Sequence, residues 1–113
     1  MTQPDSALLG RFSDLPRVRH GHLPTAIEEM PNLAKAILPN GGSGGGPGGG
    51  PRLLVKRDDC TGAGFGGNKV RQLEFYLGAA VDAGADTVLI TSAVQSNFMR
   101  TCAAMCARLG LKA

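Results

Sequence analysis

The sequence contains no tryptophan, and aromatic residues make up only 4% of its 113 residues. It also lacks any apolar run of the roughly 20 residues that a membrane-spanning helix needs. The N-terminus lacks the charged-then-apolar order of a secretory signal. We therefore expect a cytoplasmic protein that does not enter a membrane. Because aromatic side chains are so few, its core must depend on Leu, Val, Ile and Ala.

The chain also lacks a block of charges of one sign. Its 12 basic and 9 acidic residues give a net charge of +3 and are spread along the whole sequence. Nucleic-acid-binding proteins usually carry a basic stripe, in single-strand binders interleaved with aromatic residues, and none is present here. The charge pattern therefore argues against nucleic acid as a partner.

Residues that bind metals or form disulfides are few. The three cysteines are an odd number in a chain without an export signal, which favours reduced thiols. His20 and His22 flank a glycine and have no third ligand in view, so we expect no zinc site there. Cys102 and Cys106 fall on one helix face, where inward packing of small side chains explains them better than a metal does.

The composition divides the chain into three segments. Residues 1–40 are rich in proline and polar residues and predict a weakly structured lead-in, with a short helix near residues 25–37. Eight of the ten residues from 41 to 50 are glycine, so residues 41–51 predict a flexible linker or surface loop. Residues 52–113 predict an incomplete α/β cofactor-binding domain.

Within this last segment the hydrophobic pattern alternates between strand and helix. The apolar runs at residues 52–58 and 87–91 predict strands, and helices are expected at residues 69–83 and 97–109. The expected inward-facing residues are Val70, Leu73, Leu77, Ala80 and Val81 in the first helix and Met99, Ala103, Cys106 and Ala107 in the second. This order predicts a parallel sheet whose ligand site lies at the carboxyl ends of its strands.

Two nucleotide-binding motifs are nearly matched in this region. GAGFGG, residues 62–67, fits G-x-G-x-x-G, but Asp58, Asp59, Cys60 and Thr61 lie between it and the apolar run of the preceding strand, and no acidic residue ends the next strand. Residues 62–69 also have the glycine and lysine spacing of a P-loop, but Val70 stands where a hydroxyl should bind Mg²⁺. A non-catalytic nucleotide-binding module remains the alternative from another functional class.

Lys69 follows two glycines and an asparagine at the expected start of a helix. A cation there opposes the positive end of the helix dipole. Burial and the helix N-terminus favour the neutral amine, which is the form that acts as a nucleophile or base. Glycines before the lysine would let a flat cofactor ring approach the backbone. A solvated surface lysine is the other interpretation of this spacing.

A resemblance favours the chemical interpretation. KRDDCTG, FGGNKVRQLEF and AVQSN, in this order and spacing, resemble the pyridoxal-phosphate enzymes that include D-cysteine desulfhydrase and 1-aminocyclopropane-1-carboxylate (ACC) deaminase. GHLPT, residues 21–25, is similar to their lead-in, so the resemblance covers residues 17–38 and 51–113. It implies the tryptophan-synthase-like fold, known as fold type II, and pyridoxal 5′-phosphate as cofactor.

The resemblance also implies roles for individual residues. Lys69 would hold the cofactor as a Schiff base, and Ser96 and Asn97 would contact the substrate carboxylate, with Asn97 also reaching the cofactor's ring oxygen. Gln72 and Phe98 depart from the family pattern, which usually has lysine at the first position and histidine or glutamine at the second.

The implied activity is that of a lyase or deaminase of amino-acid metabolism. KRDDCTG favours the desulfhydrase, which releases sulfide, pyruvate and ammonia, and ACC deaminase or another sulfo-lyase is the alternative. We expect a small amino acid as substrate and a homodimer as the intact enzyme. The family's phosphate loop and active-site tyrosines lie beyond residue 113, so this chain resembles an N-terminal fragment and is expected to be inactive alone.

Overall fold

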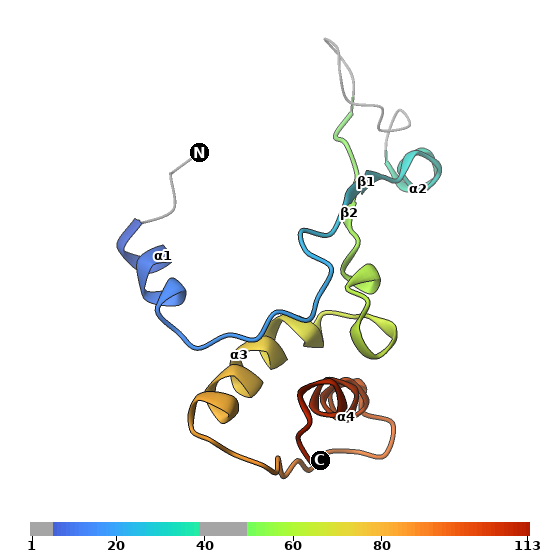
Figure 1. The fold of residues 1–113 in the computed structure, drawn as a ribbon. Helices are drawn as coiled ribbons and strands as arrows, with labels where there is room; N and C mark the ends of the chain where they lie inside the picture. Colours follow the sequence, from blue (N-terminus) through green and yellow to red (C-terminus); the bar gives the residue numbers. More distant parts are fainter. Residues whose placement is uncertain (1–5, 39–49) are drawn as a thin grey trace. The chain divides into compact units, whose positions relative to one another are not determined.

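The computed structural model describes residues 6–38 and 50–113. Its elements in chain order are helix α1 (Ser6–Ser13), strand β1 (Ile27–Glu29), helix α2 (Pro31–Ile37), strand β2 (Leu54–Lys56), the 3-10 turns η2 (Asp58–Cys60) and η3 (Ala63–Phe65), and helices α3 (Lys69–Asp82) and α4 (Asn97–Leu109) (Figure 1). The chain divides into two compact units, residues 24–58 and residues 1–23 with 59–113. The described part is therefore α/β, and residues 52–58 group with those before the glycine-rich tract. Most of that tract lies outside the described residues.

The unit of residues 24–58 is built on an antiparallel pair of strands. β1 pairs with β2 so that Ile27 lies opposite Lys56 and Glu29 opposite Leu54. This corrects the prediction that the strand at residues 52–58 belongs to a parallel sheet. The side chains of β2 alternate between exposed and half-buried, and Leu54 is 47% exposed. Such alternation is typical of an antiparallel strand that is covered on one face only.

A proline divides the helix that was predicted near residues 25–37. α2 begins at Pro31, which occupies the first turn of the helix. Proline suits this position because the first N–H groups of a helix have no intrahelical partner. The residue before a proline is disfavoured in the helical conformation, and Met30 has φ −112° and ψ 67°. The residues before it extend into β1 instead.

The other unit has its core between α3 and α4, which pack against each other (Figure 1). The buried apolar residues come from both helices and from the loop before α3: Ala63, Val70, Leu73, Leu77, Cys102, Met105 and Cys106. All three cysteines of the chain are free, and the Sγ atoms of Cys102 and Cys106 lie 3.9 Å apart in this core. The core thus contains the Leu, Val and Ala expected from the shortage of aromatics, and Met105 and two cysteines in addition.

The sequence predicted where these helices begin and end better than it predicted which of their residues are buried. α4 has the predicted bounds, and Gly110 ends it in the left-handed conformation at φ 73°. Its buried face is rotated from the predicted one and consists of Thr101, Cys102, Met105 and Cys106, whereas Ala103 and Ala107 are exposed. Thr101 is buried because Gly64, in the loop before α3, packs against its backbone. In α3 the buried stripe includes Glu74, and Val81 is 44% exposed.

The predicted parallel strand–helix unit is not confirmed. Within the described residues, segment 87–91 makes one isolated parallel bridge, from Thr87 to Lys112, a residue that follows α4 in the sequence. Val88 N–H donates to the Lys112 carbonyl at 2.9 Å, and Lys112 N–H donates to the Asp86 carbonyl at 2.9 Å. Leu89 is 94% exposed. A parallel strand needs neighbours along its length, and this single bridge supplies too few hydrogen bonds for a sheet.

Two further findings concern the whole of the described sequence. No helix in residues 6–38 or 50–113 is long and apolar enough to cross a membrane. Across the same residues, no group of three or more His, Cys, Asp and Glu side chains is arranged to hold a metal ion.

A buried carboxylate fixes the lead-in segment to α3. Glu74 is 0% exposed, and its Oε1 accepts hydrogen bonds from the backbone N–H groups of His20 and Gly21, both at 2.8 Å. Its Oε2 accepts from Arg17 Nε at 2.8 Å and from Arg17 Nη2 at 2.5 Å. One turn further along α3, a Cβ on Gly78 would lie 2.5 Å from the Pro16 carbonyl oxygen. Residues 16–21 are thus tightly held, although the sequence predicted a weakly structured lead-in.

These contacts determine how Glu74 titrates. Burial alone would raise its pKa, but the hydrogen bonds from Gly21 and His20 and the charge of Arg17 outweigh burial and lower the pKa below its ordinary value of 4.5. A lowered pKa in the folded state means that the ionised carboxylate stabilises the fold. This stabilisation is complete well above pH 4.5 and is lost as the pH falls through the lower, folded-state pKa.

We predict that Glu74→Gln destabilises the full-length protein by about 2 kcal/mol at pH 7, because it leaves Arg17 without its buried partner. The difference between variant and wild type should shrink as the pH falls below about 4, where wild-type Glu74 also becomes neutral. Denaturant unfolding at several pH values measures both effects. Glu29→Gln is the matched control, since its ion pair with Arg52 is exposed and should contribute little. Equal losses for the two variants would contradict the prediction.

Candidate functional site

The loop before α3 is closed by its own hydrogen bonds. Thr61 is 0% exposed, and its Oγ1 donates to the Gly67 carbonyl at 2.8 Å. Between these residues, Gly66 N–H donates to the Ala63 carbonyl at 3.0 Å and completes the turn η3. The two ends of the loop are therefore joined, and α3 begins two residues after the closure.

Two glycines allow this loop to pack without space for side chains. A Cβ on Gly66 would lie 2.0 Å from the Asp59 carbonyl oxygen, and Gly66 has a φ of +78°. A Cβ on Gly64 would lie 2.9 Å from the Cα of Thr101 in α4. Glycine is needed at both positions because the backbone itself makes the contact and adopts positive φ. The glycine pattern thus serves close packing of the loop against α4.

Phe65 lies between these glycines in an unusual state. Its φ is 69°, and it is the non-glycine residue with positive φ in the described sequence. Its side chain is 90% exposed. A left-handed conformation costs a bulky L-residue roughly 1–2 kcal/mol, and burial does not offset that cost here. Such strain is typical of residues at functional sites.

The start of α4 faces this loop. Ser96 is the N-cap residue, and its Oγ accepts a hydrogen bond from Met99 N–H at 3.3 Å. One turn into the helix, Arg100 Nε donates to the Gly64 carbonyl at 3.1 Å. The Arg100 guanidinium also lies over the Phe65 ring, 5.7 Å from its centroid. α4 and the loop are thus joined by a side-chain hydrogen bond and by close backbone packing.

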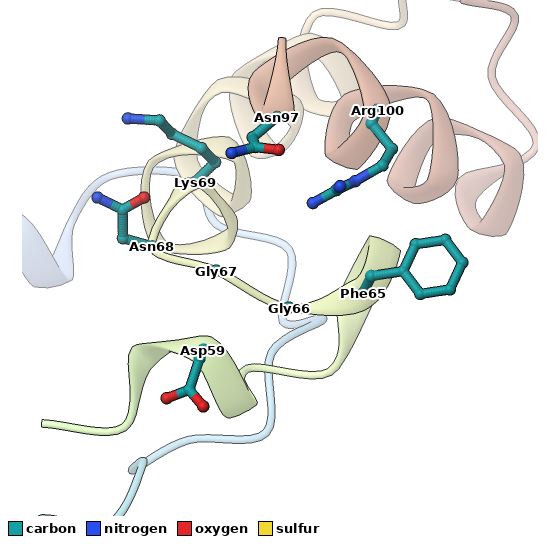
Figure 2. Close-up of a pocket in the computed structure, with 8 residues that line it drawn as sticks. All are labelled: Asp59, Phe65, Gly66, Gly67, Asn68, Lys69, Asn97 and Arg100. Atoms are coloured by element: carbon teal, nitrogen blue, oxygen red, sulfur yellow. The ribbon is translucent and has the colours of Figure 1, made fainter. Parts of the chain in front are cut away.

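These elements enclose a pocket of about 190 Å³. Its lining comes from the loop, the start of α3 and the start of α4: Asp59, Phe65, Gly66, Gly67, Asn68, Lys69, Asn97 and Arg100 (Figure 2). Lys69 is the first residue of α3, as predicted, and no hydrogen bond or ion pair among the described residues involves its ammonium. In Figure 2 this ammonium extends away from the Arg100 guanidinium, and the Asn97 amide faces the space between them.

The charges around the pocket favour an anionic ligand. Two cations, Lys69 and Arg100, line it with one carboxylate, Asp59. The N-terminus of α4 adds the positive end of its dipole. A carboxylate in the pocket would therefore be attracted from both sides.

Comparison with known proteins identifies relatives of the chain. It is 37% identical over 103 residues to a D-cysteine desulfhydrase of Salmonella typhimurium, a match that covers 91% of the chain and 28% of the relative. It is 39% identical over 107 residues to a putative 1-aminocyclopropane-1-carboxylate deaminase of Pyrococcus horikoshii, covering 95% of the chain and 28% of that protein. The predicted family resemblance is confirmed.

A solved structure supports the same conclusion for the fold. The crystal structure of an ACC deaminase homologue matches 97% of the chain with a TM-score of 0.77 and 34% sequence identity, over 30% of its own length. No protein-family model matches the chain. The chain spans about 28% of the length of the curated relatives. Its likeness to the desulfhydrase and deaminase family therefore concerns one part of those enzymes.

The structure places the predicted site residues unequally. Lys69 and Asn97 line the same pocket, whereas Ser96 lies outside the lining and caps α4. Their functional roles remain predictions. Arg100 was not predicted from the sequence, although its spacing of three residues from Asn97 places both on one helix face. Phe65 was not predicted either, because a strained backbone cannot be recognised from residue types alone.

Replacing Gly66 with alanine tests whether the loop depends on its backbone contact. Gly67→Ala is the matched control, since Gly67 also has positive φ, at +108°, but a Cβ there meets nothing within 4 Å. Gly67→Ala should cost about 1 kcal/mol of stability from the conformation alone. Gly66→Ala should cost roughly 1–3 kcal/mol more because its Cβ meets the Asp59 carbonyl. Denaturant unfolding of the full-length variants gives both values, and equal losses would show that the contact is unimportant.

Proposed function

We propose that the chain is part of a pyridoxal-phosphate-dependent lyase or deaminase that acts on a small amino acid, most directly a D-cysteine desulfhydrase. The observation that carries the proposal is that Lys69, at the start of α3, lies in one pocket with Asn97 and has no hydrogen-bond or ion-pair partner for its ammonium among the described residues. Both relatives named above act on small amino acids according to their names. ACC deaminase activity is the second candidate, because the Pyrococcus relative is as similar as the desulfhydrase.

The residues of the pocket fit the part of pyridoxal phosphate that would be bonded to the lysine. Lys69 supplies an amine that other described side chains do not hold, as covalent attachment requires. Beside it, Gly67 leaves open space where a side chain would otherwise project. Asn97 supplies an amide that would donate to the ring oxygen. The phosphate end would have to be held by residues outside this chain, as the resemblance to longer enzymes implies.

Lys69 and Asn97, which line the pocket, and Ser96, which caps α4 beside it, each have a proposed task. When bound, pyridoxal phosphate supplies an electron sink that acidifies the C–H bonds of an amino acid. Lys69 would hold the cofactor and, once released by the incoming substrate, its Nζ would take the proton from the α-carbon or its neighbour. Asn97, with the Ser96 hydroxyl, would orient the substrate carboxylate. For D-cysteine, loss of sulfide followed by hydrolysis would give pyruvate and ammonia.

The proposal concerns the full-length enzyme, because the chain spans about 28% of its curated relatives. We propose that this enzyme is a homodimer and that this segment alone is inactive. A nucleotide-binding module is the competing hypothesis. Purified full-length protein with a yellow colour and an absorption band of lysine-bound cofactor would exclude it, whereas a colourless protein that binds nucleotide would favour it.

Replacement of Lys69 gives the decisive test. Lys69→Ala should lower kcat on the order of 10³-fold or more, because the covalent attachment and the base are lost together. Lys69→Arg should lose as much, since a guanidinium stays protonated and cannot form the covalent bond. Lys112→Ala serves as the control, because Lys112 makes its contacts through backbone atoms.

Chemical trapping locates the attachment independently of turnover. Borohydride reduction of the full-length wild-type protein, followed by peptide mapping, should place the reduced cofactor on Lys69. Finding it on another lysine, or finding none, would overturn the proposal.

A further inference from the structure

We infer that Arg100 is a positioning residue of the proposed site, holding the loop before α3 in the conformation in which Lys69 and Asn97 line one pocket. The inference rests on the proposed function and extends it to a residue to which no role has been given. Its basis is the hydrogen bond from Arg100 Nε to the Gly64 carbonyl, 3.1 Å long.

The position of this hydrogen bond explains its effect. The Gly64 carbonyl belongs to the same planar peptide unit as the nitrogen of Phe65. When Arg100 fixes the direction of that carbonyl, it also fixes the plane from which the φ of Phe65 is measured. Phe65 is the strained residue, with φ 69°, and the guanidinium lies over its ring. Arg100 therefore keeps Phe65 at positive φ, and relaxation of the loop would have to start with a change in that angle.

The effect reaches Lys69 along a short chain of contacts. Gly66 N–H donates to the Ala63 carbonyl at 3.0 Å, and the Gly67 carbonyl accepts from Thr61 at 2.8 Å. If Phe65 relaxed to negative φ, the chain direction at Gly66 would change and both hydrogen bonds would be disturbed. Lys69 follows two residues after Gly67, whereas Asn97 belongs to the same helix turn as Arg100. Arg100 thus connects the two elements that carry the proposed site residues.

The substitution Arg100→Met in the full-length protein tests the inference. Arg108→Met is the matched control, because it removes another exposed arginine from the same helix. We expect Arg100→Met to lower kcat on the order of a hundredfold, since a misplaced reacting group costs about this much. KM should rise by less than about threefold, because the lost charge of Arg100 attracts the substrate only at a distance and no direct substrate contact is removed. A KM increase of about tenfold with unchanged kcat would instead make Arg100 a substrate contact and overturn the inference.

Hydrogen exchange provides a readout that does not depend on cofactor or turnover. The Gly66 amide should exchange at least about tenfold faster in Arg100→Met than in wild type or Arg108→Met, because the loop opens more often. Unchanged exchange would overturn the inference even if the borohydride label is on Lys69. Absence of that label in wild type would instead overturn the proposed function, and exchange would still test the role of Arg100 in the loop.

A second substitution, Phe65→Asn, distinguishes a positioning role of Arg100 from a general effect of Arg100 on stability. Asparagine tolerates positive φ better than phenylalanine, so Phe65→Asn should hold the loop conformation with less help from Arg100. Arg100→Met should therefore accelerate Gly66 exchange less in the Phe65→Asn background than in wild type. An equal acceleration in both backgrounds would show that Arg100 does not act through the Phe65 conformation.

Discussion

The close approach of a glycine backbone to its surroundings is the constraint on which the rest of this site depends. Gly66 contacts the Asp59 carbonyl and Gly64 contacts α4, in each case at a distance that leaves no room for a Cβ. The loop therefore has little freedom between η2 and α3. Since α3 starts directly after it, the position of Lys69 follows from these two contacts. The placement of Lys69 in the pocket thus depends on residues that carry no functional groups.

Glu74 provides a second set of contacts that fixes α3, in this case to the lead-in segment. Its carboxylate binds two backbone N–H groups and one arginine of the lead-in, so that residues 17–21 are held along the helix. An unpaired carboxylate at 0% exposure would be strongly destabilising, and the lead-in provides the compensation. A segment without regular secondary structure therefore helps to keep α3, and with it Lys69, in place.

How well the sequence predicts each feature depends on whether the signal is local. The bounds of α3 and α4 follow from nearby glycines and from side-chain periodicity, and α4 was predicted to the residue. The partner of β2 could not be predicted, because a short apolar run fits a parallel or an antiparallel neighbour equally well. Glu74 was missed because a carboxylate on an apolar stripe is rarely buried, and its partner Arg17 is 57 residues away. In the candidate site, Lys69 was singled out from its motif and lines the pocket, whereas Arg100 donates to the Gly64 carbonyl, a contact that no sequence pattern reveals.

The charges at the two helix starts are better explained by a ligand than by the fold. Neither α3 nor α4 has an acidic residue in its first turn, where one would complement the dipole. Lys69 and Arg100 stand there instead, each at an expected cost of about 0.3–1 kcal/mol. The strained Phe65 adds to these costs beside the same pocket. A negatively charged ligand would offset these two charge terms, because both cations and the dipole of α4 would attract it. The pocket is thus least favourable when empty, which is the arrangement expected of a site that binds an anionic substrate.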